Sequence, residues 1–310
     1  MSEGSQKAVT GFLQFFSRIW VALLMSTYRW PQWAKKAVAR FLAWLLWWLV
    51  PARRHVTLTN LRLCFPDKTE AERKALARDC YRCLARAVID HGFFWRASAQ
   101  EIRSVVKVDD ALRQALEDTS NQPLLIITGH FAGLDAAGIY ISTFKSAIYL
   151  YQEQSNAVWD KAVYDGRMRF KGSVLVRKNA DGSGHDIRKI IRSMREGHPF
   201  CYLPDMDYGT KNGTFINFFG VPAATITTAS RLAKISRAKV FFGAVEMTED
   251  GYYLHIRDLG SDFPTEDPVA DTERITRELE RWILRFPEQY MWLHRRFKHR
   301  PEGEESVYRR

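Results

Sequence analysis

The sequence predicts an α/β protein with a central, mostly parallel sheet flanked by helices and an apolar helical region before it. Two observations predict this fold. After residue 105, short apolar runs alternate with stretches of helical periodicity, a pattern typical of strands joined through helices. Before residue 56, two aromatic-rich apolar stretches are bordered by Lys and Arg. With 310 residues, 46% of them hydrophobic, the chain is long enough for one large core, and disorder is excluded.

The first apolar stretches cover residues 12–25 and 41–50. Both fall short of the roughly 20 apolar residues that cross a bilayer. Tryptophans and basic flanks favour helices that lie in a membrane interface, although a buried core helix is the alternative. We expect residues 1–55 to form a membrane-anchoring helical region and residues 56–310 to form a domain on the cytoplasmic side.

The elements of the second region can be placed in order. A capping box at Thr69 and Glu72 predicts a helix that runs to about Trp95. The strands are predicted at 124–128, 147–151, 174–176, 200–203, 239–246 and 252–258. The later helices are predicted at 136–143, 156–170, 187–196, 225–236 and 272–286, with Asp186 as an N-cap. Residues 178–184 are predicted to form a loop.

The net charge of +11, with ten tryptophans, suits either an anionic lipid surface or nucleic acid. The sequence has no helix-turn-helix, RNA-recognition or zinc-finger signature, which argues against nucleic acid. Four cysteines are too few for a disulfide scaffold in a chain of this length. Histidines without metal-ligand spacing predict neither a metal site nor a cofactor.

The strand at 124–128 leads into Gly129 and His130, and Asp135 follows five residues after the histidine. Five residues of regular helix rotate by about 140°, so the two side chains meet only if the histidine lies in the turn. Gly129 and Gly133 are expected to give the backbone freedom for that bend. A carboxylate on one imidazole nitrogen makes the other a general base for a hydroxyl. The alternative is a histidine that caps the sheet and an aspartate that caps the helix.

This motif resembles the H-x4-D/E motif of the lysophospholipid acyltransferase-like superfamily. Three further blocks, in the same order, are similar to the late (lauroyl- and myristoyl-type) acyltransferases of lipid A biosynthesis. They comprise residues 151–169 with Asn156, Asp160 and Gly166-Arg167-Met168-Arg169; residues 204–209 followed by Phe218-Phe219-Gly220, Pro222-Ala223 and Thr225; and residues 288–298. The resemblance covers nearly the whole chain, and the ordered set is far more specific than H-x4-D alone.

The resemblance implies an enzyme of the inner membrane that moves a fatty acyl chain from acyl carrier protein to a hydroxyl of a lipid A precursor, a secondary acylation in lipopolysaccharide biosynthesis. By position, His130 would be the general base and Asp135 its orienting partner. Arg167 and Asp205 would match the family's arginine and aspartate in substrate binding or oxyanion stabilisation. No nucleophile motif accompanies His130, which favours direct transfer.

Several alternatives remain open at this stage. Arg167 could be a surface cation, and Asp205 could belong to a turn; Asp207 would point away from Asp205 on a continuing strand. Arg295 and Arg296 could bind the acceptor's phosphates or simply be solvated beside a sealed core. The acceptor could instead be a lysophospholipid, an ornithine lipid or a polyene-type product. A non-catalytic lipid-binding membrane protein is the remaining hypothesis.

Overall fold

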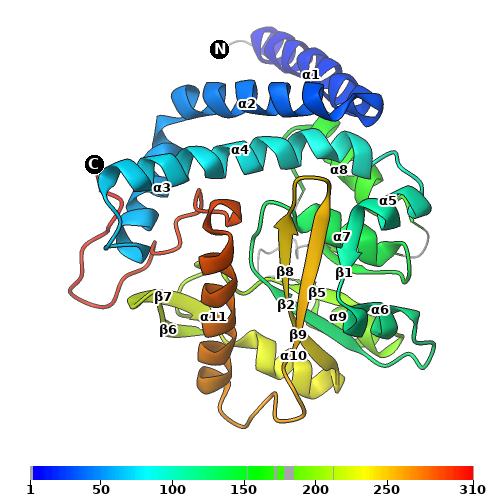
Figure 1. Cartoon of the computed structure of the whole chain (residues 1–310), viewed down its shortest axis with the longest axis vertical. Helices are drawn as coiled ribbons and strands as arrows, with labels where there is room; N and C mark the ends of the chain where they lie inside the picture. The colour runs from blue at the N-terminus through cyan, green and yellow to red at the C-terminus, as the bar shows by residue number, and fades with distance from the viewer. Residues whose placement is uncertain (1–2, 152, 171–172, 178–184, 212, 310) are drawn as a thin grey trace.

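The computed structural model describes residues 3–151, 153–170, 173–177, 185–211 and 213–309. In this part of the chain a seven-stranded sheet has the order β1-β9-β8-β2-β5-β3-β4 (Figure 1). The β8–β9 pair is antiparallel and the other pairs are parallel, as predicted. The strands are β1 (Val106–Val108), β2 (Leu124–Thr128), β3 (Ile148–Tyr151), β4 (Val174–Arg177), β5 (Phe200–Tyr202), β8 (Lys239–Met247) and β9 (Tyr252–Asp258).

A separate hairpin, which the sequence analysis missed, is formed by β6 (Gly213–Phe218) and β7 (Val221–Ile226). Its two-residue turn has positive φ angles at Phe219 (51°) and Gly220 (76°), the conformation that joins twisted antiparallel strands. The helix predicted at 225–236 therefore begins only at Thr228, because the residues before it end β7. Strand β1 was also missed, since three residues give too short a periodic signal.

Helices lie on both faces of the sheet. Figure 1 shows α11 on one side and α7 on the other, and α9, α10 and α11 pack against one another in succession. Asp186 caps α9 through the backbone N–H of Lys189, as predicted. These helices are α5 (Ala99–Val105), α6 (Asp110–Glu117), α7 (Leu134–Ser142), α8 (Ala157–Met168), α9 (Ile187–Arg195), α10 (Thr228–Ser236) and α11 (Pro268–Arg285); short 3-10 turns are η1 (Thr27–Arg29) and η2 (Pro287–Gln289). The loop predicted at 178–184 lies outside the described residues.

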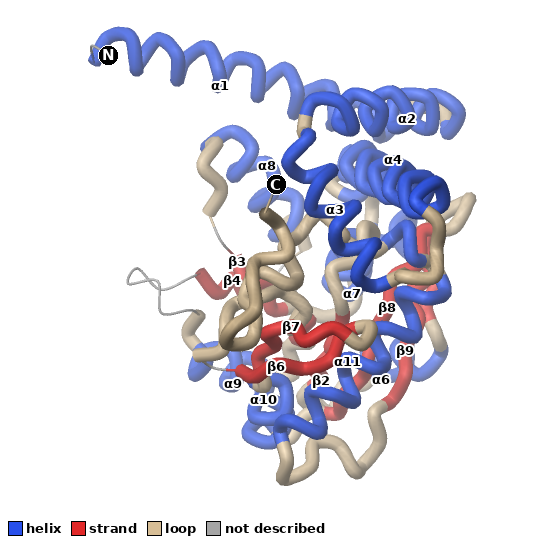
Figure 2. Tube along the Cα trace, turned by 90° about the vertical axis from the view of Figure 1, so that its left-hand side faces the viewer, coloured by secondary structure: helices blue, strands red, loops and turns tan. Residues whose placement is uncertain are grey.

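The N-terminal helices form a layer beside one end of the sheet. They are α1 (Glu3–Ser26), α2 (Gln32–Leu49), α3 (Pro51–Cys64) and α4 (Glu70–Phe94). The predicted capping box of α4 is present, with Glu72 N–H bonded to Thr69 Oγ1 and Thr69 N–H bonded to Glu72 Oε2. Figure 2 shows α1 and α2 outside α4. Among the helices described, none is both long enough and apolar enough to span a bilayer.

The inner side of α2 belongs to the main hydrophobic core, through Ala39, Ala43 and Trp47. Helix α3 runs without interruption across the expected boundary between residues 55 and 56. Strand β8 is parallel to β2, and its arrow in Figure 1 points toward α4. The carboxyl ends of the parallel strands therefore lie below the N-terminal helices, and this edge carries the candidate site.

Candidate active site

His130 lies two residues beyond β2, beside the end of the neighbouring strand β5. Ile127 pairs with Tyr202 in the parallel register, so three residues further along each strand His130 comes next to Asp205. His130 Nδ1 lies 2.7 Å from Asp205 Oδ1, and the backbone N–H of His130 donates to Asp205 Oδ2 at 2.8 Å. One carboxylate thus holds both the imidazole and the backbone of the same residue.

Asp205 is 4% exposed and accepts a third hydrogen bond, from the Tyr290 hydroxyl at 3.0 Å. Burial alone would raise the pKa of Asp205, but the charge of His130 and the hydrogen bonds from His130 outweigh it and lower the pKa to about 2. A carboxylate accepts only, so neutral His130 carries its proton on Nδ1 and keeps a lone pair on Nε2. Burial lowers the pKa of His130, and Asp205 more than reverses this, so the net shift is upward.

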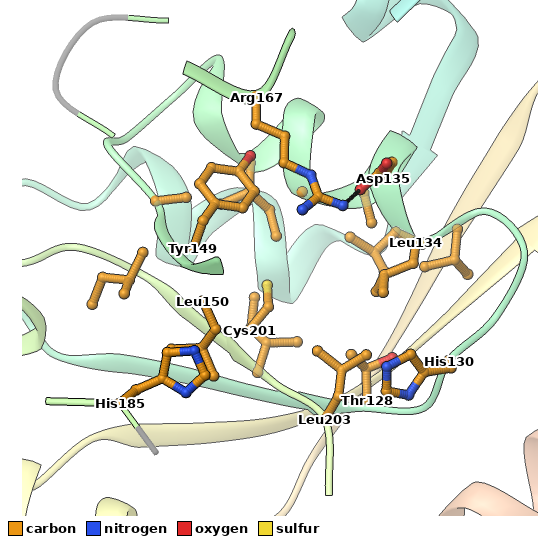
Figure 3. A pocket seen from close by; sticks show the side chains of 18 of the residues that line it. Thr128, His130, Leu134, Asp135, Tyr149, Leu150, Arg167, His185, Cys201 and Leu203 are labelled. Carbon is orange, nitrogen blue, oxygen red and sulfur yellow. Dashed lines mark hydrogen bonds and ion pairs between the residues drawn. The ribbon is translucent and has the colours of Figure 1, made fainter. Parts of the chain in front are cut away.

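Asp135 does not make the contact with His130 that we expected. Its Oδ1 accepts from Arg167 Nη2 at 2.7 Å (Figure 3). Its Oδ2 lies 2.7 Å from His91 Nε2. The bend after β2 explains the difference: Phe131 forms a bridge with Tyr290, and Asp135 sits in the first turn of α7, directed toward α4 and α8. The histidine and the aspartate of the motif therefore belong to two different side-chain pairs.

The pair of Asp135 and Arg167 is braced from α4. His91 Nδ1 lies 2.8 Å from the Ala87 carbonyl oxygen, which fixes the ring that contacts Asp135. Burial would raise the pKa of Asp135, but the Arg167 charge and the His91 contact hold it well below its ordinary value. Asp135 in turn raises the pKa of Arg167. The guanidinium is thus a fixed cation at the end of α8 rather than the surface charge that was the alternative.

Gly129 and Gly133 are required for close packing, not for the backbone freedom we expected. Neither has a positive φ angle. A Cβ at Gly129 would lie 2.5 Å from Leu279 Cδ1 and 3.3 Å from Asp205 Oδ2, and one at Gly133 would lie 2.8 Å from Val245 Cγ1. A side chain at either position would force a shift of Leu279 on α11 or Val245 on β8, or of the turn itself.

The C-terminal segment holds the turn from the other side. Met291 N–H donates to the His130 carbonyl at 2.9 Å, and Ala132 N–H donates to the Gln289 carbonyl at 2.8 Å. The rings of His294 and His130 lie 5.6 Å apart. Burial and the His130 charge lower the pKa of His294 to about 4, so His294 is neutral near pH 7.

His130, Asp135 and Arg167 line one cavity of about 330 Å³ between α7 and the sheet (Figure 3). Its remaining walls are largely apolar and come from β2, β3, β5 and α7, including Ile126, Leu134, Ala137, Ile141, Ile148, Cys201 and Leu203. Polar groups are thus gathered at the carboxyl edge of the sheet, and the space beyond them suits a hydrocarbon chain better than a polar ligand.

The two arginines of the C-terminal block, Arg295 and Arg296, lie in different environments. Arg296 is 3% exposed and bonds the Ala224 carbonyl at 2.8 Å and Thr225 Oγ1 at 2.6 Å, so its side chain braces β7 and does not face a phosphate as we had considered. Arg295 is exposed, with its guanidinium over the Tyr308 ring. Asp207 bonds His299, away from Asp205's partners.

The structure adds three residues that the sequence did not indicate as part of the site. They are His91, Tyr290 as a donor to Asp205, and His185, which lines the cavity. Each comes from a distant part of the chain. Tyr290 stands in the block at residues 288–298, whereas no motif marks His91 or His185. In the described ranges no group of three or more His, Cys, Asp or Glu side chains is arranged to hold a metal ion.

Comparison with known proteins identifies the family of the chain. The family model described as bacterial lipid A biosynthesis acyltransferase matches residues 7–299. The lipid A biosynthesis palmitoleoyltransferase of Escherichia coli K12 is 29% identical over 261 residues, which cover 83% of this chain and 82% of that protein. A lipid A biosynthesis acyltransferase of Haemophilus influenzae is 31% identical over 254 residues, 81% of this chain and 79% of its own.

The family-model match extends from the N-terminal helices to the C-terminal block. The protein is of the acyltransferase class. The chain belongs to the bacterial lipid A biosynthesis acyltransferase family.

Proposed function

We propose that the protein moves a fatty acyl group from an acyl carrier protein thioester to a hydroxyl of a lipid A precursor, at the cytoplasmic face of the inner membrane. Family membership supports the reaction class. The observation that carries the proposal is the state of His130: Asp205 occupies its Nδ1, and its ring lines a largely apolar cavity. An apolar cavity beside a poised base suits a substrate with a reactive carbonyl at the end of a hydrocarbon chain.

His130 Nε2 accepts the proton of the acceptor hydroxyl as its oxygen attacks the thioester carbonyl. A carbon–oxygen bond forms, the carbon–sulfur bond breaks, and His130 can return the proton to the departing thiolate. Asp205 keeps the required tautomer and stabilises the imidazolium that forms meanwhile. A thioester is already activated, so the transfer needs no acyl-enzyme.

Arg167 is the candidate donor to the oxyanion. It lines the cavity of His130, and its Nε is buried without a hydrogen-bond partner in the described structure. A guanidinium already held in place loses little freedom when charge develops on the carbonyl oxygen. Asp135 acts here as a positioning residue, because its contacts are with Arg167 and His91 rather than with the base.

The acyl chain would lie along α7, in the apolar part of the cavity. From Asp135 to Ile141 the helix advances about 9 Å at 1.5 Å per residue, and both residues line the space. The relatives named as lauroyl-, myristoyl- and palmitoleoyltransferases act with different acyl groups, as their names state. The residues that close the far end would then select chain length.

Membrane association is the second part of the proposal. Large apolar side chains on α1 and α2 are exposed, among them Phe15 (59%), Leu23 (51%), Trp33 (74%), Phe41 (59%) and Trp44 (59%). A soluble surface rarely carries so many large apolar groups on adjacent helices. The indole rings of Trp33 and Trp44, together with the net charge of +11, suit an anionic lipid surface.

The test is a His130→Ala variant assayed with acyl-acyl carrier protein and a lipid A precursor. We expect a loss of at least about 10³-fold in rate, because the base is removed. His198→Ala is the matched control, since His198 lies before the amino end of β5. Thermal unfolding checks that both variants fold. A fully active His130→Ala enzyme contradicts the mechanism, and unchanged lipid A in cells lacking the gene favours the other acceptors.

A further inference from the structure

A second cavity lies on the surface between α2 and α4, apart from the active site. It measures about 310 Å³, and its lining includes Arg40, Arg78 and Arg82 together with Trp44, Trp47 and Trp48. The α2 residues share one helix face, since they are spaced by three or four positions, and so do Arg78 and Arg82 on α4. Figure 1 shows α2 lying along α4. We call this feature the arginine groove.

The arginine groove has an excess of positive charge. Arg78 lies over the Trp47 ring with its guanidinium carbon 5.4 Å from the ring centroid, and Arg54, from α3, lies 5.3 Å from the same centroid. Arg82 pairs with Asp79. In the part of the chain that the structure describes, neither Arg40 nor Arg78 has a carboxylate partner. Two guanidinium groups are therefore available to an anion from outside.

We propose that the arginine groove binds the phosphate of an anionic phospholipid headgroup in the bilayer. Guanidinium groups match phosphate oxygens in geometry and charge. The rim is lipid-like in its chemistry: Trp44 and Trp48 are 59% and 60% exposed, and indole rings prefer the depth of the headgroups. A free phosphate ion would use the arginines but would leave these rings in water. The site rests on the proposed membrane association and not on the proposed reaction.

The position of the groove gives the binding a consequence for orientation. Helix α4 carries Arg82 in the groove and, nine residues further on, His91 against Asp135. Nine residues of helix span about 14 Å. A headgroup held in the groove would thus keep α4 against the bilayer, with the carboxyl edge of the sheet beneath it. The arginine groove orients the enzyme, whereas the exposed apolar side chains supply most of the adhesion.

Co-sedimentation of the full chain with phosphatidylcholine vesicles, with and without phosphatidylglycerol, tests the site. We expect Arg40→Gln/Arg78→Gln to bind phosphatidylglycerol vesicles at least about tenfold more weakly than the unaltered protein, since each basic residue near an anionic surface contributes about 1 kcal/mol. Arg188→Gln/Arg192→Gln, with the same change of charge on the exposed side of α9, should change binding less than twofold. Arg40→Lys/Arg78→Lys should recover only part of the loss, because Lys cannot contact phosphate bidentately.

Each other outcome is decisive. Equal losses of vesicle binding in the groove and α9 variants would indicate general charge attraction and would overturn the proposed site. Unchanged vesicle binding by the groove variant would overturn it as well. Competition by inorganic phosphate at constant ionic strength would reassign the groove to free phosphate. If the unaltered protein binds neither kind of vesicle, the proposed membrane association is wrong. Acyl transfer to detergent-dispersed acceptor, which the groove variant should retain, reports separately on the reaction.

Discussion

Asp205→Asn is the substitution that most directly tests how the site works. Asp205 now accepts from His130 Nδ1 through one oxygen, and from the His130 backbone N–H and the Tyr290 hydroxyl through the other. An asparagine has one oxygen and one NH₂ group. If the asparagine oxygen takes the place of Oδ2, it accepts from both the His130 backbone N–H and the Tyr290 hydroxyl. The NH₂ group then faces His130 Nδ1. His130 then accepts at Nδ1 and carries its proton on Nε2, where the lone pair is needed.

We expect the rate of acyl transfer to fall by about 10³- to 10⁴-fold, the size of loss seen when a catalytic histidine is held in the wrong tautomer. At 1.36 kcal/mol per factor of ten this equals about 4–5 kcal/mol of transition-state stabilisation. The pH profile should move as well. Asp205 raises the pKa of His130, and the base must be neutral, so the acidic limb of any residual activity should shift to lower pH in the variant.

Initial rates with acyl-acyl carrier protein, and imidazole ¹⁵N shifts that report the tautomer, measure the two effects. Asp207→Asn is the control, because this neighbouring carboxylate contacts His299 and not His130. We expect the control to keep its rate within about threefold, as a change outside the site should. A variant Asp205→Asn that keeps both the Nδ1–H tautomer and a rate within tenfold of the unaltered enzyme would refute the reasoning.

Three further predictions follow from the cavity and its ion pairs. Arg167→Gln should lower kcat by about 10²- to 10³-fold with a smaller change in KM, whereas Lys161→Gln on the exposed side of α8 should not; equal effects would exclude an oxyanion role. Cys201→Phe, which fills the space reached by the sulfur in Figure 3, should shift donor preference toward shorter chains by about tenfold or more for each methylene excluded, measured by competition between acyl donors. The pKa of Asp135 in the folded protein lies below its ordinary 3.8, so its contribution to stability is present above that pH and is lost as pH falls. In denaturant unfolding, Asp135→Asn should lose about 3 kcal/mol of unfolding free energy near pH 7. Its unfolding free energy should also fall less steeply with acid than that of the unaltered protein.

Much of the fold could be predicted because its signals are local. The strands at 124–128 and 252–258 and the capping box at Thr69 depend on residues adjacent in the sequence, and the structure confirms them. The hairpin of β6 and β7 was missed because its residues were assigned to a family block and to a helix start. The burial of Arg296 was equally hidden, since its partners on β7 lie about 70 residues away.

The carboxylate that contacts His130 could not be predicted from the sequence, because the contact depends on the order of strands in the sheet. The sequence predicts strands that end just before His130 and Asp205, yet the H-x4-D motif indicates Asp135 as the partner of His130. The contact of His130 with Asp205 depends on β5 lying beside β2, although β3 and β4 come between them in the chain. Once that order is known, the register of Ile127 with Tyr202 brings residues 130 and 205 together without further assumption. The H-x4-D spacing then has a different physical meaning: it places the bend after β2 between the base and the carboxylate that holds Arg167. His130, held by Asp205, and Arg167, held by Asp135, thus line one cavity from separate elements.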